Sequence, residues 1–174
     1  MLLYHGSAVA GLTVLLPRLS NHERPYVYLT DSATLALLYA CNPIARPGGF
    51  FPYWFDQGGQ LHYDEYFPDQ TRIIYESREG WVYRAEDSSL PHPDRMPWVY
   101  LSTDPVPVLG ADHIPDLYSA LLAAEKAGRI CIHRYEDFTP EQQERHRQVV
   151  RRSLDGPTVD DYLRFLRQYM PELF

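Results

Sequence analysis

The chain has 174 residues, of which 45% are hydrophobic and 22% charged, so it can bury an ordinary core, and disorder, a coiled coil and a collagen-like chain are excluded. The formal net charge of −7 argues against nucleic acid as a partner, because a nucleic-acid surface needs a basic face. No apolar run approaches the roughly 18 residues of a membrane span, and the N-terminus lacks the basic lead of a signal peptide. We therefore expect a cytoplasmic protein with no membrane partner.

The N-terminal part predicts two short strands and a helix. Residues 2–5 suit a strand that ends in the turn His5-Gly6-Ser7. A second β-rich run covers 26–29, and the Thr30-Asp31-Ser32 that follows contains good N-cap residue types. Helix formers then occupy 33–40, so the helix is expected directly after the second strand.

The middle of the chain predicts an irregular segment and then several strands. Residues 43–70 are rich in Pro, Gly and aromatic side chains, which indicates an aromatic-packed excursion without regular structure. A proline-containing loop is expected over 87–97. Short strands are expected over 73–76, 80–86, 98–102 and 106–109.

The C-terminal part predicts helices. Residues 116–127 suit a helix ending at Gly128, and a strand is expected over 130–134. Two further helices follow, of which the first begins with a capping box at Thr139. The whole pattern predicts an α+β fold with one domain over 1–135 and a C-terminal helical extension, 136–174, packed on it.

The cysteine and histidine residues carry no metal-binding pattern. Cys41 and Cys131 lie on apolar stretches without a spacing such as Cys-x-x-Cys, and we interpret both as buried, reduced thiols. His62, Asp64 and Glu65 lack the spacing that would direct three ligands to one point, and we interpret them as part of a solvated loop. We therefore expect no metal ion.

Three pieces of the N-terminal part suit a slot for a nicotinamide riboside. A glycine beside His5 leaves backbone groups open to a carboxamide, which needs one donor and one acceptor. Tyr28 ends one strand and Tyr39 lies eleven residues later on the next helix, so their rings can face each other across a flat aromatic ring. His5 and the Ser7 hydroxyl can bond to a sugar.

This pattern resembles the ADP-ribosyltransferase family, in its diphtheria-toxin and poly-ADP-ribose polymerase branch. The family begins with a strand ending in His-Gly-Thr/Ser, here His5-Gly6-Ser7, and continues with Tyr-x-Thr/Ser, here Tyr28-Leu29-Thr30, before a helix with a second tyrosine, here Tyr39. The resemblance implies a split β-sandwich of short strands with flanking helices, and NAD bound in its cleft as substrate. Gly6 would hold the nicotinamide carboxamide, the two tyrosines would sandwich the ring, and His5 would bond a ribose. His5, Gly6, Ser7, Tyr28, Thr30 and Tyr39 are thus the expected NAD-binding residues.

The third element of that family is an acidic residue at the start of a late strand. It holds a ribose hydroxyl and supports the cationic transition state. The best positional match is Asp104, before Pro105-Val106-Pro107, and Glu76 and Glu86 are rivals on earlier strands. By the resemblance His5, Tyr28 and Asp104 would be catalytic, and the protein would transfer ADP-ribose to an acceptor such as a protein, with release of nicotinamide.

Three alternatives stay open, one of which is an interaction protein whose C-terminal helices contact a partner. Another is a module of the same fold that binds NAD or ADP-ribose without turnover, because Asp is one methylene shorter than the family's Glu. The third is an enzyme similar to the tRNA 2′-phosphotransferases, which share the fold and need an arginine-rich pocket. The candidate arginines are unclustered in sequence: Arg18, Arg24, Arg46, Arg72 and Arg84.

Overall fold

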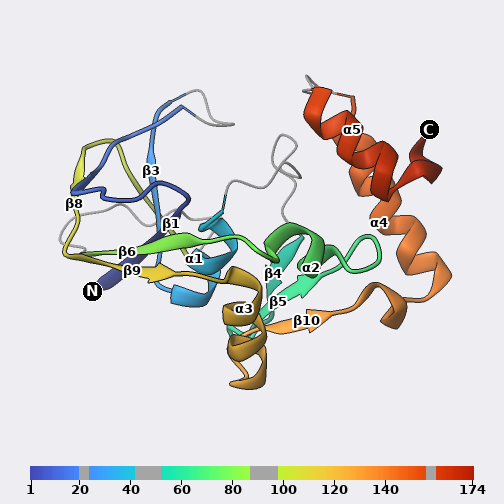
Figure 1. Ribbon diagram of the computed structural model, residues 1–174, viewed down its shortest axis with the longest axis horizontal. Coiled ribbons are helices and arrows are strands. Elements are labelled where there is room, and N and C mark those ends of the chain that lie inside the picture. Colours follow the sequence, from blue (N-terminus) through green and yellow to red (C-terminus); the bar gives the residue numbers. More distant parts are fainter. Residues whose placement is uncertain (20–23, 42–51, 87–97, 156–159) are drawn as a thin grey trace. The chain divides into compact units, whose positions relative to one another are not determined.

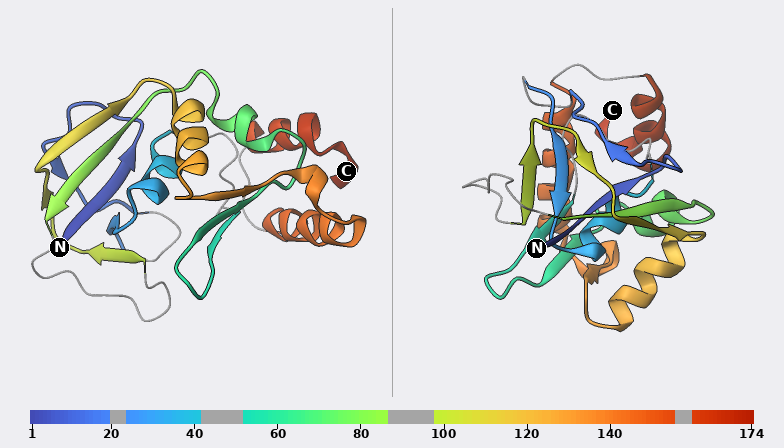
Figure 2. Two further views of the ribbon diagram at one scale, coloured as in Figure 1. Left: turned by 90° about the horizontal axis from the view of Figure 1, so that it is seen from below. Right: turned by 90° about the vertical axis from the view of Figure 1, so that its left-hand side faces the viewer.

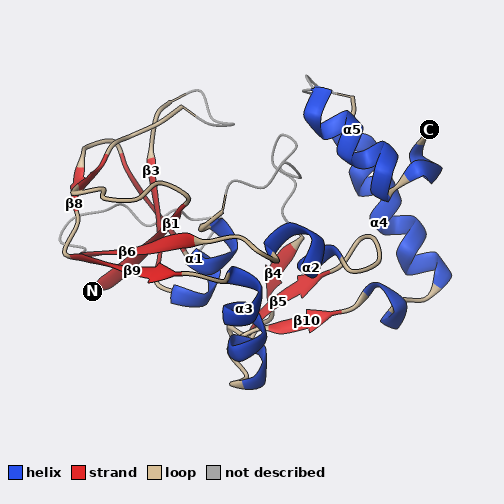
Figure 3. Ribbon diagram, viewed as in Figure 1, coloured by secondary structure: helices blue, strands red, loops and turns tan. Residues whose placement is uncertain are grey.

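The computed structural model describes residues 1–19, 24–41, 52–86, 98–155 and 160–174. Helices are interspersed among groups of strands along the chain, and most neighbouring strands pair in antiparallel fashion, so the fold is α+β (Figures 1 and 3). Among the described helices, not one combines the length and the apolar character that crossing a bilayer requires.

The chain divides into two compact units, each built from two separate segments. Unit 1 consists of Met1–Asn42 and Ser77–Leu121, and unit 2 of Pro43–Glu76 and Leu122–Phe174. This partition differs from the expected division at residue 135, because the C-terminal helices group with residues 43–76 and with the chain after Leu121.

Unit 1 contains a five-stranded antiparallel sheet in the order β7-β3-β1-β6-β9 (Figure 2). Its strands are β1 (Leu2–Ser7), β3 (Val27–Thr30), β6 (Gly80–Glu86), β7 (Val99–Ser102) and β9 (Gly110–Ile114). The central strand β1 pairs with β6 along its whole length, but its registered pairing with β3 is confined to Tyr4 and Thr30. On the side of β1 that faces β3, the registered strand pairing therefore does not extend to the His5–Ser7 end of β1.

One face of this sheet forms the hydrophobic core of unit 1. The two-residue alternation of strands directs Leu3, Leu29 and Tyr83 to the same face, where each is at most 2% exposed. Leu15 and Val106 pack against them from a second, two-stranded sheet, made of β2 (Val14–Leu15) and β8 (Val106–Pro107).

The opposite face packs against helix α1 (Ala33–Tyr39). Glycines allow this close approach: a Cβ atom at Gly6 would lie 1.9 Å from the carbonyl oxygen of Ala36, and one at Gly80 would lie 2.1 Å from that of Ala40. Strands β1 and β6 thus meet the helix backbone directly, with no side chain between them.

Unit 2 contains a three-stranded sheet in the order β10-β5-β4. Its strands are β4 (Tyr53–Phe55), β5 (Leu61–Asp64) and β10 (Cys131–His133), and β10 runs parallel to β5. Leu61, Tyr63 and Ile132 are buried on one face. By strand alternation, Trp54, His62, Cys131 and His133 share the other face.

Helices make up the rest of the described structure. They are α2 (Gln70–Tyr75), α3 (Leu117–Lys126), α4 (Pro140–Ser153) and α5 (Asp160–Tyr169), with short 3₁₀ turns at Tyr135–Asp137 and Pro171–Leu173. Val150 of α4 packs with Tyr162 and Leu166 of α5 and with Phe67 in a second hydrophobic cluster.

Several expected elements are confirmed. The strand 80–86 is β6, and the helix over 33–40 is α1, whose first turn is capped by Ser32 Oγ accepting from the amide of Leu35. The capping box at Thr139 is present at the start of α4.

Other local expectations are wrong. Residues 73–75 form the end of helix α2 instead of a strand, and Glu76 caps it, because burial of Ile74 and Tyr75 in unit 2 outweighs their β preference. His5-Gly6-Ser7 is not a turn but the last part of β1, paired with β6. The segment expected to be irregular contains β4 and β5, while its part over 43–51 and the loop 87–97 lie outside the described residues.

Candidate functional site

A pocket of about 170 Å³ opens on unit 1 where β1 ends. Its walls are His5 and Ser7 of β1, four leucine and valine side chains between residues 12 and 16, Arg18, and residues 26–28 around the start of β3. The volume is below the roughly 300–1,000 Å³ of pockets that enclose a whole drug-sized ligand. The pocket therefore suits part of a ligand, such as one ring or sugar.

A side-chain bond fixes His5 at this pocket. The His5 Nδ1 atom lies 2.8 Å from the carbonyl oxygen of Tyr28, so the imidazole donates to the β3 backbone and Nδ1 carries the proton. This tautomer leaves Nε2 as an acceptor. Ser7 Oγ accepts from the amide of Val9 at 3.1 Å, which holds the hydroxyl near the chain that leads to β2.

Strand alternation places the predicted residues on both faces of β1. His5 pairs with Tyr83 of the core face, so Gly6 is directed to the opposite face, against α1. The Tyr4–Thr30 register directs the Tyr28 ring to that same α1 face, where it meets the Tyr26 ring edge-on at 6.2 Å.

Gly6, Tyr28 and Tyr39 come from β1, β3 and α1, which pack together in unit 1. The backbone carbon of Tyr39 lies 2.8 Å from the position that a Cβ atom of Gly6 would occupy. The α1 backbone thus takes up the space expected for a ligand beside Gly6, and it explains on packing grounds why a glycine stands there. Thr30 is buried, and its hydroxyl accepts from the amide of Ser32 at 3.1 Å.

The candidate acids are not part of the described pocket lining. Asp104 is exposed in the turn between β7 and β8, where the Ser102 hydroxyl holds its backbone by a donated bond of 2.9 Å and an accepted bond of 3.1 Å. Glu86 is exposed at the end of β6 and pairs with Leu2, at the far end of β1 from His5. Glu76 belongs to unit 2.

Charge at the pocket has one sign. Among the described residues that line it, Arg18 bears the one permanent charge and no carboxylate occurs. Arg18 also forms an antiparallel bridge with Tyr26, with backbone bonds of 3.0 and 3.2 Å, which ties the arginine to the strand entering β3. An exposed arginine in the lining of a pocket that otherwise offers apolar, hydroxyl and imidazole groups favours an anionic ligand.

The other candidate arginines do not gather here. Arg84 forms an ion pair with Asp112 at 3.5 Å, and Arg72, in unit 2, pairs with Asp69 at 2.8 Å. Arg46 lies outside the described residues. The arrangement gives no support to an arginine-rich RNA pocket in the described part of unit 1.

A second polar cluster, in unit 2, escaped the sequence analysis. His62 lies on strand β5 and not in a solvated loop, and Glu65 is only 2% exposed, where it accepts from the amides of Thr71 and Tyr135. Cys131 is partly exposed, so the interpretation of two buried thiols holds for Cys41 alone.

The signal for this cluster is the alternation Cys131-Ile132-His133, which directs both polar side chains to one face of a strand. Its third member, His62, is 71 residues away from His133, and the parallel pairing of β10 with β5 brings the two together. Long-range strand pairing is not readable from a single sequence.

Comparisons with models of protein families, with curated proteins and with solved structures found no match.

Proposed function

We propose that unit 1 binds NAD or an ADP-ribose-like ligand on an ADP-ribosyltransferase-like split β-sandwich. The observation that carries the proposal is the convergence of His5, Ser7 and Tyr28, expected from the family pattern, on one pocket whose permanent charge is the cation of Arg18. A dinucleotide has a pyrophosphate, two sugars and flat rings, and this lining offers a partner to each kind of group.

The roles follow from the chemistry of each side chain. Arg18 would face the pyrophosphate, because a guanidinium forms paired bonds to phosphate oxygens. His5 Nε2 and the Ser7 hydroxyl would bond to ribose hydroxyls. Tyr28, the one of the two predicted tyrosines that belongs to the described pocket lining, would contact the nicotinamide ring, and the pocket volume implies that the remaining ligand lies along the protein surface.

Binding without transfer is the form of the proposal that the geometry supports best. A transferase needs a carboxylate that stabilises the positive charge developing on the ribose. Asp104 is exposed, and the described pocket lining contains no acidic residue.

ADP-ribosyl transfer, which releases nicotinamide, is the second candidate. One observation favours it: the turn that carries Asp104 leads directly into β8, and β8 pairs with β2, whose Val14 and Leu15 line the pocket. Transfer would require a change in the conformation of this turn that brings the carboxylate to the pocket.

One experiment separates these forms. Calorimetric titration with NAD, ADP-ribose and nicotinamide measures binding, and chromatography of the NAD incubation measures nicotinamide release. We expect ADP-ribose and NAD to bind, with no release. Release that is lost in Asp104→Asn would establish the transferase instead, and the absence of binding by all three ligands would overturn the proposal.

Arg18→Gln tests whether Arg18 binds the pyrophosphate of the ligand, with Arg24→Gln as the matched control. Both arginines are exposed, but Arg24 is not part of the pocket lining. We expect Arg18→Gln to weaken the binding of ADP-ribose at least about tenfold, as for loss of a charged hydrogen bond. Arg24→Gln should leave the affinity for ADP-ribose unchanged. Equal effects of the two variants would contradict the assignment.

A further inference from the structure

The polar face of the sheet in unit 2 gathers three side chains of metal-ligating type. Cys131 and His133 are two residues apart on β10, and the parallel register aligns Cys131 with His62 on β5. One ligand atom from each residue lies within 4.8 Å of the other two. All three belong to unit 2, whereas the pocket described above belongs to unit 1.

The two histidines are joined by a hydrogen bond between their rings, so one proton lies between the two nitrogens. His62 Nδ1 and His133 Nε2 are 2.9 Å apart and the two rings are nearly coplanar, at 4°, as in an N–H···N hydrogen bond. A neutral pair therefore needs one lone pair and one N–H at this contact. Zinc bonds of 2.0–2.3 Å in a tetrahedron separate ligand atoms by roughly 3.3–3.8 Å. To hold a metal ion, the nitrogens must move apart by about half an ångström, the His133 ring must turn so that both lone pairs meet off the N–N line, and the three ligand atoms, now within 4.8 Å of one another, must close to these distances.

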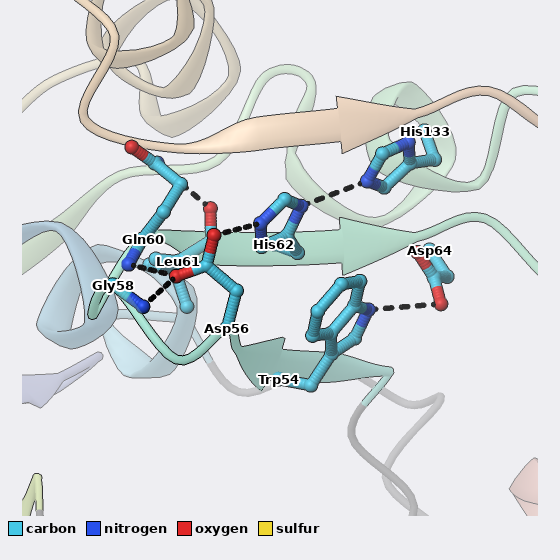
Figure 4. Close-up of polar contacts among 8 residues, drawn as sticks. All are labelled: Trp54, Asp56, Gly58, Gln60, Leu61, His62, Asp64 and His133. Atoms are coloured by element: carbon cyan, nitrogen blue, oxygen red, sulfur yellow. Dashed lines mark hydrogen bonds and ion pairs between the residues drawn. The ribbon is translucent and has the colours of Figure 1, made fainter.

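A carboxylate faces the second ring nitrogen of His62 without making a hydrogen bond to it, and its charge favours a proton on that nitrogen. His62 Nε2 lies 3.5 Å from Asp56 Oδ2 on the side of the ring away from His133 (Figure 4). Asp56 is itself held in place, because its Oδ1 accepts from the amides of Gly58 and Gln60, each at 2.9 Å. With the proton on Nε2, the Nδ1 lone pair faces His133, and carboxylate–histidine–metal arrangements of this kind are usual around bound metals.

The indole ring of Trp54 packs on the face of the His62 ring and restrains it. Trp54 stacks on His62 at 4.0 Å with an angle of 7° between the planes, and its N–H donates to Asp64 Oδ2 at 3.1 Å (Figure 4). The stack limits rotation of the His62 ring, so less ordering is needed when a ligand binds.

We propose that His62, Cys131 and His133 bind a zinc ion, with the fourth position left to water. Two imidazole nitrogens and one thiolate suit zinc, and three protein ligands with an open fourth position are typical of accessible zinc sites. On binding, the shared proton moves from Nε2 to Nδ1 of His133, so both imidazoles stay neutral. The Cys131 thiol loses its proton to solvent, because sulfur binds the metal as thiolate.

Cobalt(II) serves as the spectroscopic probe for this site, followed by competition with zinc. We expect one Co(II) per chain, a thiolate-to-cobalt charge-transfer band, and displacement of cobalt by stoichiometric zinc. Zinc titrations in buffers of different ionisation enthalpy should report release of about one proton per ion from the thiol. Absence of the band, or zinc binding that is weak and not stoichiometric, would overturn the proposal.

Matched variants separate a built site from general binding by surface groups. Cys131→Ser should abolish the charge-transfer band and weaken zinc binding at least about tenfold. Cys41→Ala removes the thiol of unit 1 and should change neither the band nor the zinc affinity. His133→Asn should weaken zinc similarly, with His113→Asn as control, because His113 is exposed and pairs with Glu79. Circular dichroism of each apo variant confirms its fold. Unchanged zinc affinity in folded Cys131→Ser and His133→Asn would overturn the proposal.

Asp56→Asn tests the positioning role of the carboxylate. The variant keeps an oxygen for the Gly58 and Gln60 amides but replaces the acceptor facing His62 with an N–H donor. We expect zinc affinity to fall roughly 10–100-fold while the cobalt band persists, since the three ligands remain. An unchanged affinity would remove Asp56 from the site.

Discussion

At the scale of single residues, Gly6 shows how one position can suit two explanations. In the sequence, a glycine between His5 and Ser7 suggests a backbone open to a ligand. In the structure, the α1 backbone fills the space beside Gly6, with the Ala36 oxygen 1.9 Å from where a Cβ would lie. Packing alone therefore requires glycine here, and the ligand proposal depends on His5, Ser7, Tyr28 and Arg18.

Gly6→Ala should lower the free energy of unfolding by at least about 1–3 kcal/mol, because the added methyl group must displace a helix backbone and not a flexible side chain. Denaturant titration measures this. Gly58→Ala is the control: its Cβ would lie 3.3 Å from Asp56 Oδ1, and we expect a change within about 0.5 kcal/mol. Similar values for the two variants would contradict the close approach.

His146 is a second residue whose environment predicts a measurable property. It stacks on Tyr66 at 4.1 Å and meets the Phe138 ring at 4.5 Å, and its Nδ1 is buried with no hydrogen-bond partner among the described residues. Burial lowers the pKa of His146, although the nearby Asp64 opposes this shift.

The lowered pKa of His146 predicts a loss of stability in acid. The unfolded chain binds the proton more readily, so stability is full above the ordinary histidine pKa of about 6.5 and falls as the pH drops through that value towards the lower folded pKa. His146→Phe keeps the stack and removes the titration, so its melting temperature should fall less than that of the wild type between pH 7.5 and 5.5. His113→Phe, at an exposed position, should not reduce the loss.

At the scale of elements, local signals predicted helix ends well. Helix α4 begins at Pro140 behind a reciprocal pair: Thr139 Oγ1 accepts from the Gln142 amide at 3.3 Å, and Gln142 Oε1 accepts from the Thr139 amide at 2.8 Å. Such caps depend on neighbours in sequence, which is why they can be predicted without a structure.

Thr139→Ala should destabilise the protein by about 1 kcal/mol, the usual cost of losing an N-cap. Thr103→Ala removes the same hydroxyl from an exposed turn and should have little effect. Thermal unfolding followed by circular dichroism compares the two, and equal shifts in melting temperature would show that the cap contributes nothing measurable.

Strand pairing explains most of what the sequence did not reveal. The strand β9 has the polar sequence Gly-Ala-Asp-His-Ile and an exposed centre, so no alternation marks it, and its pairing with β6 defines it. Helix α2 was mistaken for a strand because Ile73, Ile74 and Tyr75 prefer strands, and only their burial in unit 2 reverses this preference. The candidate site divides in the same way: His5, Ser7 and Tyr28 were predicted for one pocket, whereas the His62–His133 contact depends on the pairing of segments 71 residues apart.

At the scale of the whole molecule, the two proposed ligands belong to different units. Hydrogen–deuterium exchange should therefore show protection by ADP-ribose in β1, in the chain around β2 and in β3, and protection by zinc in β4, β5 and β10. Cys131→Ser should remove the second pattern and keep the first. Loss of both patterns in that variant would contradict the assignment of the ligands to separate units.

The division of the chain also constrains the order of events during synthesis. Each unit consists of two segments. The N-terminal strands of unit 1 therefore cannot complete their sheet until β6 to β9 have been synthesised, and unit 1 is complete only after residue 121. Residues 43–76 likewise lack the rest of unit 2 until the C-terminal segment has been synthesised. At typical synthesis rates of roughly 5–20 residues per second, that interval lasts several seconds. During it the edge of β5 that later pairs with β10 lacks its partner, so the nascent chain should depend on chaperones more than a protein of two contiguous domains does.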